Sequence, residues 1–412
     1  MVPSFERYHL VYRLKIGNYS FMFGITRFSQ LLTHLPKKAF KKIVAECGAD
    51  KYLKKLKSWD LITIMLYGQL TQAKSLRTLV NGFSSHSNEH YHLNTQDIKR
   101  STLSDALAIR SIEPFKKLCE HLMNNVSRSD RKKCKEFVSI IDSSPIQLKG
   151  YGYSWTEETK NIRLQGLKLH LEIDSIENAP TYVNISASNI NDITDAKNYI
   201  KIKKDYTYVV DKGYFDFNWW YKINLLKAYF VTRTKSNTAY KVVKELEVFE
   251  TDKEIILSDE VIHLTNKKPR KGKINKYANK GVRLVTVIRE GKKPMPIITN
   301  DFKRTALEIA ELYKRRWQIE LFFKWIKQKL KLKSYFGQSK NAVIIQIYCA
   351  LISYLLMRLM SKSSDLWKTM LELQTWLQHG LFVRDSINTF YYRQRKQKDQ
   401  MISSLQLQVN FT

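Results

Sequence analysis

The chain has 412 residues, of which 43% are hydrophobic, and carries 70 Lys and Arg residues against 38 Asp and Glu. This length is too great for one simple core, so we expect two to four domains. The formal net charge of +32 is spread along the whole chain, which argues against a merely solvated basic surface and indicates an extended polyanionic partner, most simply nucleic acid.

The cysteines and the apolar segments disfavour two further classes of protein. The four cysteines lie far apart and form no CxxC pair: Cys47, Cys119, Cys134 and Cys349. We therefore expect neither a zinc site nor a disulfide framework, and we expect a reducing compartment. The most apolar run, 342–360, is interrupted by polar residues, so it predicts a buried core helix and no membrane span.

The first part of the chain has a helical pattern. Residues 1–27 show no clear periodicity and no secretory signal, and we expect a poorly specified extension there. Residues 28–126 carry apolar residues at helical spacing, which predicts a small all-α domain. Within it, segment 100–111 (RSTLSDALAIRS) places polar residues in the first turn of a helix, as a DNA-recognition helix does. We therefore expect this domain to bind DNA.

A β-type pattern begins after the basic segment 127–136. Short apolar or alternating runs predict strands at 137–141, 166–173, 181–187, 207–210 and 228–233, and helices at 192–201 and 214–226. Three strands followed by alternating helices and strands predict an α/β fold. We expect residues 137–233 to form a mixed sheet with helices on its faces.

The second half of the chain interrupts this pattern and then returns to it. Residues 234–300 contain several strand-like pieces and a very basic loop, which predicts a β-rich insertion domain. Residues 301–340 return to the core through a long helix. Residues 341–412 have the pattern of a helical C-terminal region that ends in a basic tail.

One long helix is predicted from Thr305 to Lys333. Thr305 and Glu308 form a capping box at its start. Four polar residues then recur along the edge of its apolar face: Tyr313, Arg316, Glu320 and Lys327. At about 100° per residue they share a stripe about 60° wide. The carboxylate of Glu320 among so many cations is either a salt-bridge partner of Arg316 or Lys324, or a metal ligand.

Two aspartates follow short apolar strands in the predicted core. Asp142 ends FVSIID and Asp211 ends YVVD; alone, each could be only a turn former or a helix cap. In open α/β sheets, however, functional groups collect at the carboxyl ends of strands. Together with Glu320 they would form a three-carboxylate cluster, which repels itself and is costly without cations. The natural use of such a cluster is to hold two Mg²⁺ ions at a phosphodiester.

These residues resemble the family of DDE transposases of the insertion sequence 4 type. Tyr313-x2-Arg316-x3-Glu320-x6-Lys327 reproduces the Y-R-E-K signature of that family. FVSIIDSSPI and YVVDKGY are similar to the aspartate segments of its RNase H-like core, and the β-rich insertion and helical N-terminal domain lie in the matching places. The resemblance covers about residues 28–380.

The resemblance implies an insertion-sequence transposase that cuts and pastes DNA. It implies that Asp142, Asp211 and Glu320 bind two Mg²⁺ ions, with Mn²⁺ as a possible substitute. It further implies phosphate contacts from the other members of the signature, and Lys324 and Trp317 are candidates for DNA contact beside them. The implied partners are double-stranded DNA, as terminal inverted repeats and target, and a second copy of the chain, in the nucleoid of a bacterial cytoplasm.

Some alternatives remain open at this point. The chain could be a catalytically silent or domesticated DNA-binding descendant of a transposase, or an RNase H-like nuclease that does not transpose. In some members of the family a tryptophan of the insertion stacks on a flipped base while the DNA end forms a hairpin. The insertion here has no tryptophan, which leaves Tyr240, Tyr277 and Trp317 as candidates. For Trp317, Trp219 and Trp220, we expect simple core packing.

Overall fold

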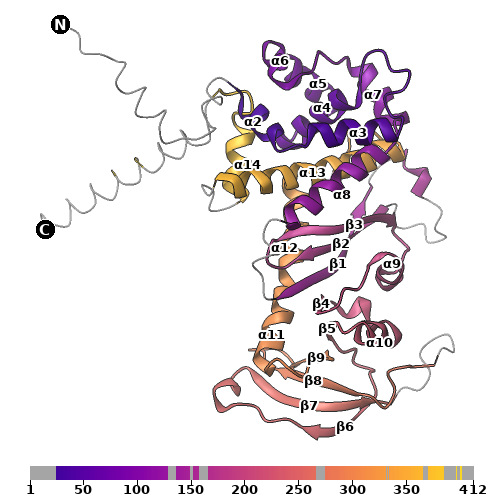
Figure 1. The fold of residues 1–412 in the computed structure, drawn as a ribbon, viewed down its shortest axis with the longest axis vertical. Helices are drawn as coiled ribbons and strands as arrows, with labels where there is room; N and C mark the ends of the chain where they lie inside the picture. The colour runs from indigo at the N-terminus through magenta and orange to yellow at the C-terminus, as the bar shows by residue number, and fades with distance from the viewer. Residues whose placement is uncertain are drawn as a thin grey trace, which may run out of the picture. The chain divides into compact units, whose positions relative to one another are not determined.

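The computed structural model describes residues 25–128, 136–148, 152–156, 166–265, 274–330, 332, 334–364, 370–384, 396 and 400. The predicted extension up to residue 24, the centre of the basic loop (266–273) and nearly all of the basic tail after residue 384 lie outside the described residues. The chain divides into two compact units, one formed by 1–122 with 334–412 and the other by 123–333 (Figure 1).

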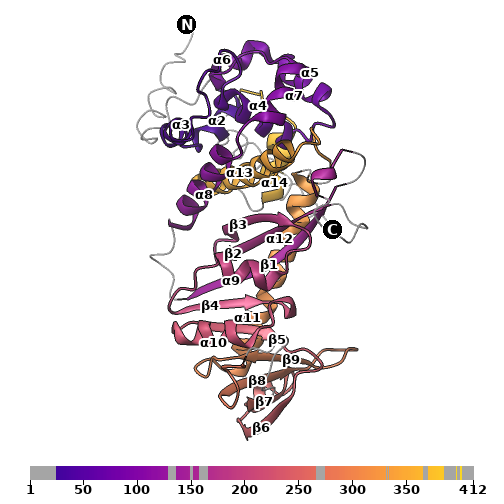
Figure 2. The same ribbon diagram turned by 90° about the vertical axis from the view of Figure 1, so that its right-hand side faces the viewer.

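The first unit consists of helices. They are α2 (Arg27–Thr33), α3 (Lys37–Glu46), α4 (Ser58–Leu70), α5 (Leu76–Ser84), the 3-10 turn η1 (Ser87–Glu89), α6 (His90–Leu93), α7 (Arg100–Ile109), α8 (Glu113–Arg128), α13 (Lys340–Ser364) and α14 (Met370–Gln378). Helix α13 packs against α4, α7, α14 and α2 and forms the centre of this unit. N- and C-terminal segments of the chain therefore share one core (Figure 2).

Helix α13 contains the most apolar run of the chain. Its segment Lys340–Lys362 is long and apolar enough to cross a membrane, but 89% of its most apolar window is buried within the protein. This burial agrees with the predicted core helix. Cys47, Cys119 and Cys349 are free thiols, and the latter two are buried; Cys134 lies outside the described residues.

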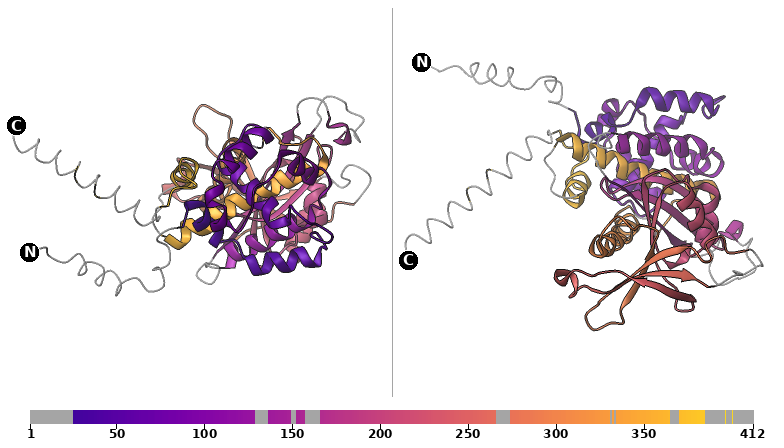
Figure 3. Two further views of the ribbon diagram at one scale, coloured as in Figure 1. Left: turned by 90° about the horizontal axis from the view of Figure 1, so that it is seen from above. Right: turned by 60° about the horizontal axis from the view of Figure 1, so that its bottom comes forward.

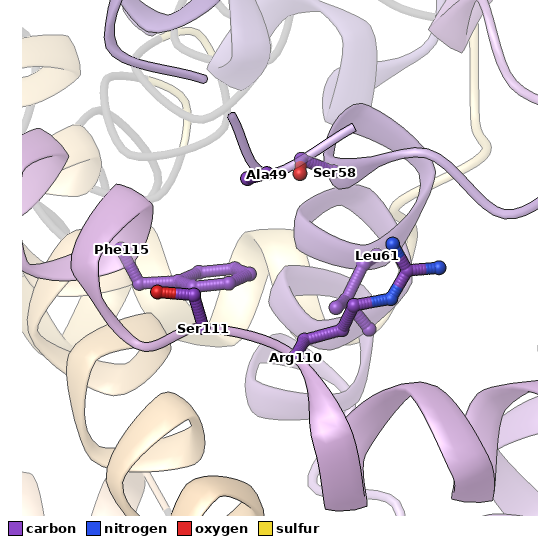
Figure 4. Close-up of a pocket in the computed structure, with 6 residues that line it drawn as sticks. All are labelled: Ala49, Ser58, Leu61, Arg110, Ser111 and Phe115. Atoms are coloured by element: carbon purple, nitrogen blue, oxygen red, sulfur yellow. The ribbon is translucent and has the colours of Figure 1, made fainter. Parts of the chain in front are cut away.

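The segment that resembles a recognition helix forms α7, whose first turn exposes Arg100, Ser101 and Ser104. Arg110, directly after it, turns inward and donates to the carbonyl of Leu56 at 2.9 Å. It lines a cavity of about 10 Å³, shown in Figure 4 with Ala49, Ser58, Leu61, Ser111 and Phe115. That volume holds one water molecule at most, so the cavity has no room for a larger ligand.

The second unit is built on one nine-stranded sheet. Its strands are β1 (Phe137–Gln147), β2 (Gly166–Asp174), β3 (Ala179–Ala187), β4 (Tyr206–Val210), β5 (Tyr229–Arg233), β6 (Tyr240–Glu245), β7 (Ile256–Leu264), β8 (Gly281–Val287) and β9 (Met295–Thr299). Their order is β3-β2-β1-β4-β5-β9-β8-β7-β6. Strands β4 and β5 run parallel to β1, and every other neighbouring pair is antiparallel. The insertion strands thus continue the core sheet (Figure 3).

Helices cover both faces of the core sheet. Helices α9 (Asp192–Tyr199) and α10 (Phe217–Leu225) lie on one face, and α11 (Ala306–Arg315) and α12 (Trp317–Lys329) lie on the other (Figures 1 and 2). Short 3-10 turns η3 (Ser154–Thr156), η4 (Lys212–Tyr214) and η5 (Glu250–Asp252) lie in the connections. Strand β4 is buried on both faces, as expected for a central parallel strand.

The predicted fold class is confirmed: a mixed sheet with flanking helices, a β-rich insertion and helical regions on either side of it in the chain. The order of three strands, a helix, a strand, a helix and a strand is found as predicted. Trp219 and Trp220 are at most 2% exposed, which confirms core packing for both. Trp317 is 58% exposed, so the same prediction was wrong for it.

Candidate active site

Asp142 and Asp211 occupy equivalent places on neighbouring strands. The parallel pairing of β1 with β4 ends at the pair Ile141 and Val210, and the two aspartates are the next residues. The prediction that Asp142 closes its strand was wrong, because β1 continues to Gln147 as a partner of β2 alone. The two acids nevertheless lie side by side, because the parallel pairing is what ends there.

Each aspartate is fixed by a backbone group near it in the chain. Asp211 is the N-cap of η4, and its Oδ1 accepts from the amide of Gly213 at 2.6 Å. Asp142 Oδ1 accepts from the amide of Ser143 at 2.8 Å. The interpretation of Asp211 as a turn former is therefore correct, and it leaves the second oxygen of each carboxylate for other partners.

The environment of Asp142 disfavours its negative charge. Burial raises the pKa of Asp142 to about 7, and the carboxylates of Asp211 and Asp192 act in the same direction. The amide of Ser143 and the guanidinium of Arg316 oppose this rise in pKa. A carboxylate in such a place gains most from a neighbouring cation.

The predicted long helix is divided in two at Arg316. The amide of Arg316 donates to the carbonyl of Tyr313 at 3.1 Å, and the carbonyl of Arg316 accepts from the amide of Ile319 at 3.3 Å. These bonds span three residues, so the helix tightens here into a 3-10 turn between α11 and α12. The capping box is found as predicted, with Thr305 and Glu308 at the start of α11.

Arg316 connects the helix pair to the sheet. Its Nη2 lies 2.6 Å from Glu320 Oε1, and its Nη1 lies 3.7 Å from Asp142 Oδ2. Burial alone would lower the pKa of Arg316, but Tyr313, Glu320 and Asp142 raise it. The ring of Tyr313, which is only 6% exposed, lies 5.7 Å from the guanidinium carbon. The guanidinium therefore lies between two of the three predicted metal ligands.

The rest of the predicted stripe meets the outer half of β1. Lys327 Nζ donates to Ser144 Oγ at 2.6 Å and to the carbonyl of Pro145 at 2.7 Å. Lys324 and Trp317 are exposed on α12. The salt-bridge partner of Glu320 is Arg316 and not Lys324. The stripe thus places Arg316 beside the two strand aspartates and Lys327 further along β1.

The three predicted carboxylates do not share one point in this structure. Asp142 and Asp211 are neighbours, whereas Glu320 reaches Asp142 through Arg316. Over the described ranges, no group of three His, Cys, Asp or Glu side chains is placed to hold a metal ion. The chemistry of the donors still fits a divalent cation, since carboxylate oxygens are what Mg²⁺ prefers. A cation would also offset the burial and the repulsion by Asp211 and Asp192, which together raise the pKa of Asp142.

Sequence reasoning missed a third acid beside the pair. Asp192, the first residue of α9, accepts from Ser143 Oγ at 2.6 Å and from Lys168 Nζ at 3.1 Å. The sequence places it only at the start of the predicted helix 192–201, where an acidic residue is explained by the helix dipole. The signal for buried acids was in β2, where two basic residues, Lys168 and His170, interrupt an apolar strand. Lys168 pairs with Asp192, and His170 Nδ1 lies 3.8 Å from the buried carboxylate of Asp195.

Comparisons with known proteins relate this chain to transposases. Residues 133–356 match the family described as Transposase DDE domain, and residues 23–95 match a domain of unknown function (DUF4372). The chain is 36% identical over 287 residues to the putative transposase y4zB of Sinorhizobium fredii (strain NBRC 101917 / NGR234), covering 69% of this chain and 78% of that protein.

Two further relatives match shorter stretches. The probable transposase for insertion sequence element IS5377 of Geobacillus stearothermophilus is 32% identical over 130 residues, which cover 31% of this chain and 32% of the relative. The putative transposase for insertion sequence element IS4SA of Synechocystis sp. is 36% identical over 102 residues, which cover 25% and 28%. A cryo-EM structure of the piggyBac transposase synaptic complex with hairpin DNA aligns over 90% of this chain and 81% of that chain, with a TM-score of 0.45 and 10% identity.

Proposed function

The chain belongs to the transposase DDE-domain family, and from this premise we propose that it excises and reinserts its own insertion sequence by a cut-and-paste route. Members of this family are metal-dependent enzymes that cleave and transfer DNA. In the proposed reaction, hydrolysis at each element end frees a 3′-hydroxyl. That hydroxyl then attacks a phosphodiester of the target DNA and joins its phosphorus, while the bond from phosphorus to the 3′-oxygen of the target strand breaks and that oxygen leaves.

Asp142, Asp211 and Glu320 are the proposed ligands of two Mg²⁺ ions, with Mn²⁺ as a possible substitute. Bound at these carboxylates, the ions would activate the attacking oxygen and stabilise the leaving one. Asp142 and Asp211 already lie side by side. Glu320 would join them once the guanidinium of Arg316 turns from the carboxylates to a phosphate of the DNA.

The observation that carries this proposal is the position of Arg316. Its two Nη atoms contact Glu320 and Asp142, so one guanidinium touches both the helix acid and a strand acid. A guanidinium binds a phosphate through two parallel hydrogen bonds. The ring of Tyr313, which is 6% exposed, lies beside it, so we assign to Tyr313 the support of this guanidinium rather than a phosphate contact of its own. Lys327 lies further along β1, and we assign a phosphate contact to it. Lys324 and Trp317, exposed on the same helix, extend this surface.

The proposed partners are the terminal inverted repeats of the element and the target DNA. The exposed first turn of α7 is suited to contact the repeats. Two DNA ends must be held at once, so we propose a homodimer, acting in the nucleoid of the bacterial cytoplasm. If the ends form hairpins, Tyr277 is excluded as the stacking residue because it is 2% exposed. Tyr240 and Trp317, at 42% and 58% exposed, remain available.

The direct test is cleavage of a duplex that carries the repeats bordering the gene of this chain, in the presence of Mg²⁺. We expect Asp142→Asn and Glu320→Gln each to slow cleavage by about a thousandfold or more, because metal assistance supplies several kcal/mol of transition-state stabilisation. The matched control is Glu311→Gln, an exposed acid on α11, which should cleave like the parent.

The same assay separates the alternatives. Cleavage by either site variant at the parental rate would refute the assignment of the metal ligands. Binding of the repeats without any cleavage by the parent would indicate a silent DNA-binding descendant. Cleavage at random positions, with no preference for the repeats, would indicate a nuclease that does not transpose.

A further inference from the structure

The turn after β4 carries a buried hydroxyl without a hydrogen-bond partner. Tyr214 ends η4, close to Asp211 in the chain, and is only 1% exposed. Among the described residues, its hydroxyl neither donates nor accepts a hydrogen bond. A buried hydroxyl in this condition destabilises the fold, so its presence calls for an explanation.

The unpartnered hydroxyl lies within electrostatic reach of the acids of the active site. Burial raises the pKa of Tyr214, and the carboxylates of Asp142, Asp192, Asp211 and Asp195 raise it further, in that order. These carboxylates come from β1, α9 and the end of β4. The hydroxyl is therefore placed where three separate elements direct negative charge.

Asp192 is fixed through one oxygen, and its second oxygen, Oδ2, accepts no hydrogen bond from the described residues. Its Oδ1 accepts from Ser143 Oγ at 2.6 Å and from Lys168 Nζ at 3.1 Å. A Cβ atom placed on Gly213 would lie 3.2 Å from Asp192 Oδ2 and 2.8 Å from Asp211 Oδ1. Both carboxylates thus approach the same backbone position, which carries no side chain to keep them apart.

We propose that Asp192 and Tyr214 are positioning residues of the metal site, which hold water molecules of a divalent cation bound by Asp142 and Asp211. This inference rests on the proposed function, because it presupposes a cation at those two aspartates. Mg²⁺ usually keeps several of its waters when it binds a protein. The free Oδ2 of Asp192 would accept from such a water, and the Tyr214 hydroxyl would gain the partner that it lacks. Ser143 and Lys168 hold Asp192 in place beforehand.

The test is direct titration of the full chain with Mn²⁺ alone, followed by electron paramagnetic resonance without DNA. We expect Asp192→Asn and Tyr214→Phe each to weaken Mn²⁺ binding about tenfold or more, the usual effect of losing an outer-shell partner. Asp195→Asn is the matched control, because this nearby acid already accepts from Asn184 at 2.5 Å and Tyr182 at 3.3 Å. Asp195→Asn should bind Mn²⁺ within about twofold of the parent. Equal losses of Mn²⁺ affinity in all three variants would mean that a general change in the charge around the site weakens binding, and would overturn the inference.

Melting temperatures show whether the Tyr214 hydroxyl serves the metal site or stabilises the fold. Without metal, Tyr214→Phe should melt at the parental temperature or above it, because it removes an unsatisfied buried group. With Mn²⁺ it should gain less in melting temperature than the parent does, since a ligand that binds more weakly stabilises the folded state less at the same concentration. A metal-free Tyr214→Phe that melts below the parent and binds Mn²⁺ equally well would overturn the inference.

Asp211→Asn distinguishes failure of this inference from failure of the proposed function. If Asp211→Asn loses Mn²⁺ binding while Asp192→Asn and Tyr214→Phe bind like the parent, the positioning roles are wrong and the metal site stands. If Asp211→Asn itself binds like the parent, the cation is not held at this site and both proposals fall.

Discussion

Two arginines of the sheet unit show how differently one residue type is used. Arg283 on β8 forms a bidentate pair with Asp259, with Nε 2.9 Å from Oδ1 and Nη2 2.6 Å from Oδ2, and the two side chains are 6% and 3% exposed. Arg316 shares its guanidinium between Glu320 at 2.6 Å and Asp142 at 3.7 Å. Its Nε is buried and has no hydrogen-bond partner among the described residues.

The difference lies in how completely each guanidinium is satisfied. Arg283 also donates through Nη1 to the carbonyls of Asp301 and Arg304, at 3.2 Å and 2.5 Å, just before α11 begins. It fixes the insertion to the start of the helix pair that carries Arg316. Arg316 keeps one donor unused and one contact long. A complete network holds structure in place, whereas an incomplete one leaves donors for a ligand.

A large effect on stability is expected from Arg283→Ala. Removing one partner of a buried ion pair leaves the other charge uncompensated, so we expect a loss of about 3–5 kcal/mol in the free energy of unfolding. Chemical denaturation measures this loss. Arg289→Ala is the matched control, because Arg289 is half-buried in the same insertion and, among the described residues, donates to the Lys293 carbonyl and to no carboxylate. Equal losses in both variants would remove the contrast between the two arginines.

Arg316→Ala is expected to reduce cleavage strongly and stability little, the opposite of Arg283→Ala. We expect end cleavage to fall by about a hundredfold, as for loss of a preorganised donor to transition-state charge. The free energy of unfolding should change by less than about 1 kcal/mol, because the pair with Glu320 is partly exposed and gains little from Coulomb attraction. Arg315→Ala, which removes a neighbouring arginine paired with Glu136, is the control for cleavage. A large loss of stability in Arg316→Ala would make it a second structural arginine.

The sequence predicted the pair of strand aspartates because its signals are local. The apolar runs before Asp142 and Asp211 define adjacent parallel strands, and parallel strands bring equivalent ends together. The continuation of β1 past Asp142 had no such signal, since it depends on pairing with β2. The break at Arg316 was hidden as well, because no Gly or Pro marks it. It coincides with contacts of Arg316 to Asp142, a residue far away in the chain.

A smaller effect should separate Lys327 from Lys324, two lysines on one helix. Lys327 is held against Ser144 and Pro145 of β1 beside the site, so Lys327→Ala should reduce end cleavage about tenfold while lowering overall DNA affinity much less. Exposed Lys324 is the comparison: Lys324→Ala should lower affinity and cleavage together and reduce the salt slope of binding by about one. Filter-binding titrations over a salt series measure both. Equal losses of cleavage and affinity in Lys327→Ala would reduce it to a general phosphate contact.

The smallest effect on stability is expected from Trp317→Ala, measured against Trp220→Ala. Trp220 is 0% exposed and stacks on Phe230 with ring centroids 4.9 Å apart, so its removal should cost about 3–5 kcal/mol. Trp317 is 58% exposed on the helix of Glu320, and its removal should change the free energy of unfolding by no more than about 0.5 kcal/mol.

Trp317→Ala also tests DNA stacking. If the indole of Trp317 stacks on a base, the binding free energy of Trp317→Ala for DNA with an unpaired end should weaken by about 1–3 kcal/mol. Fluorescence-detected unfolding and binding measure the two quantities separately. Parental affinity in Trp317→Ala for that DNA would leave Tyr240 as the stacking candidate, because the other tyrosine considered, Tyr277, is buried.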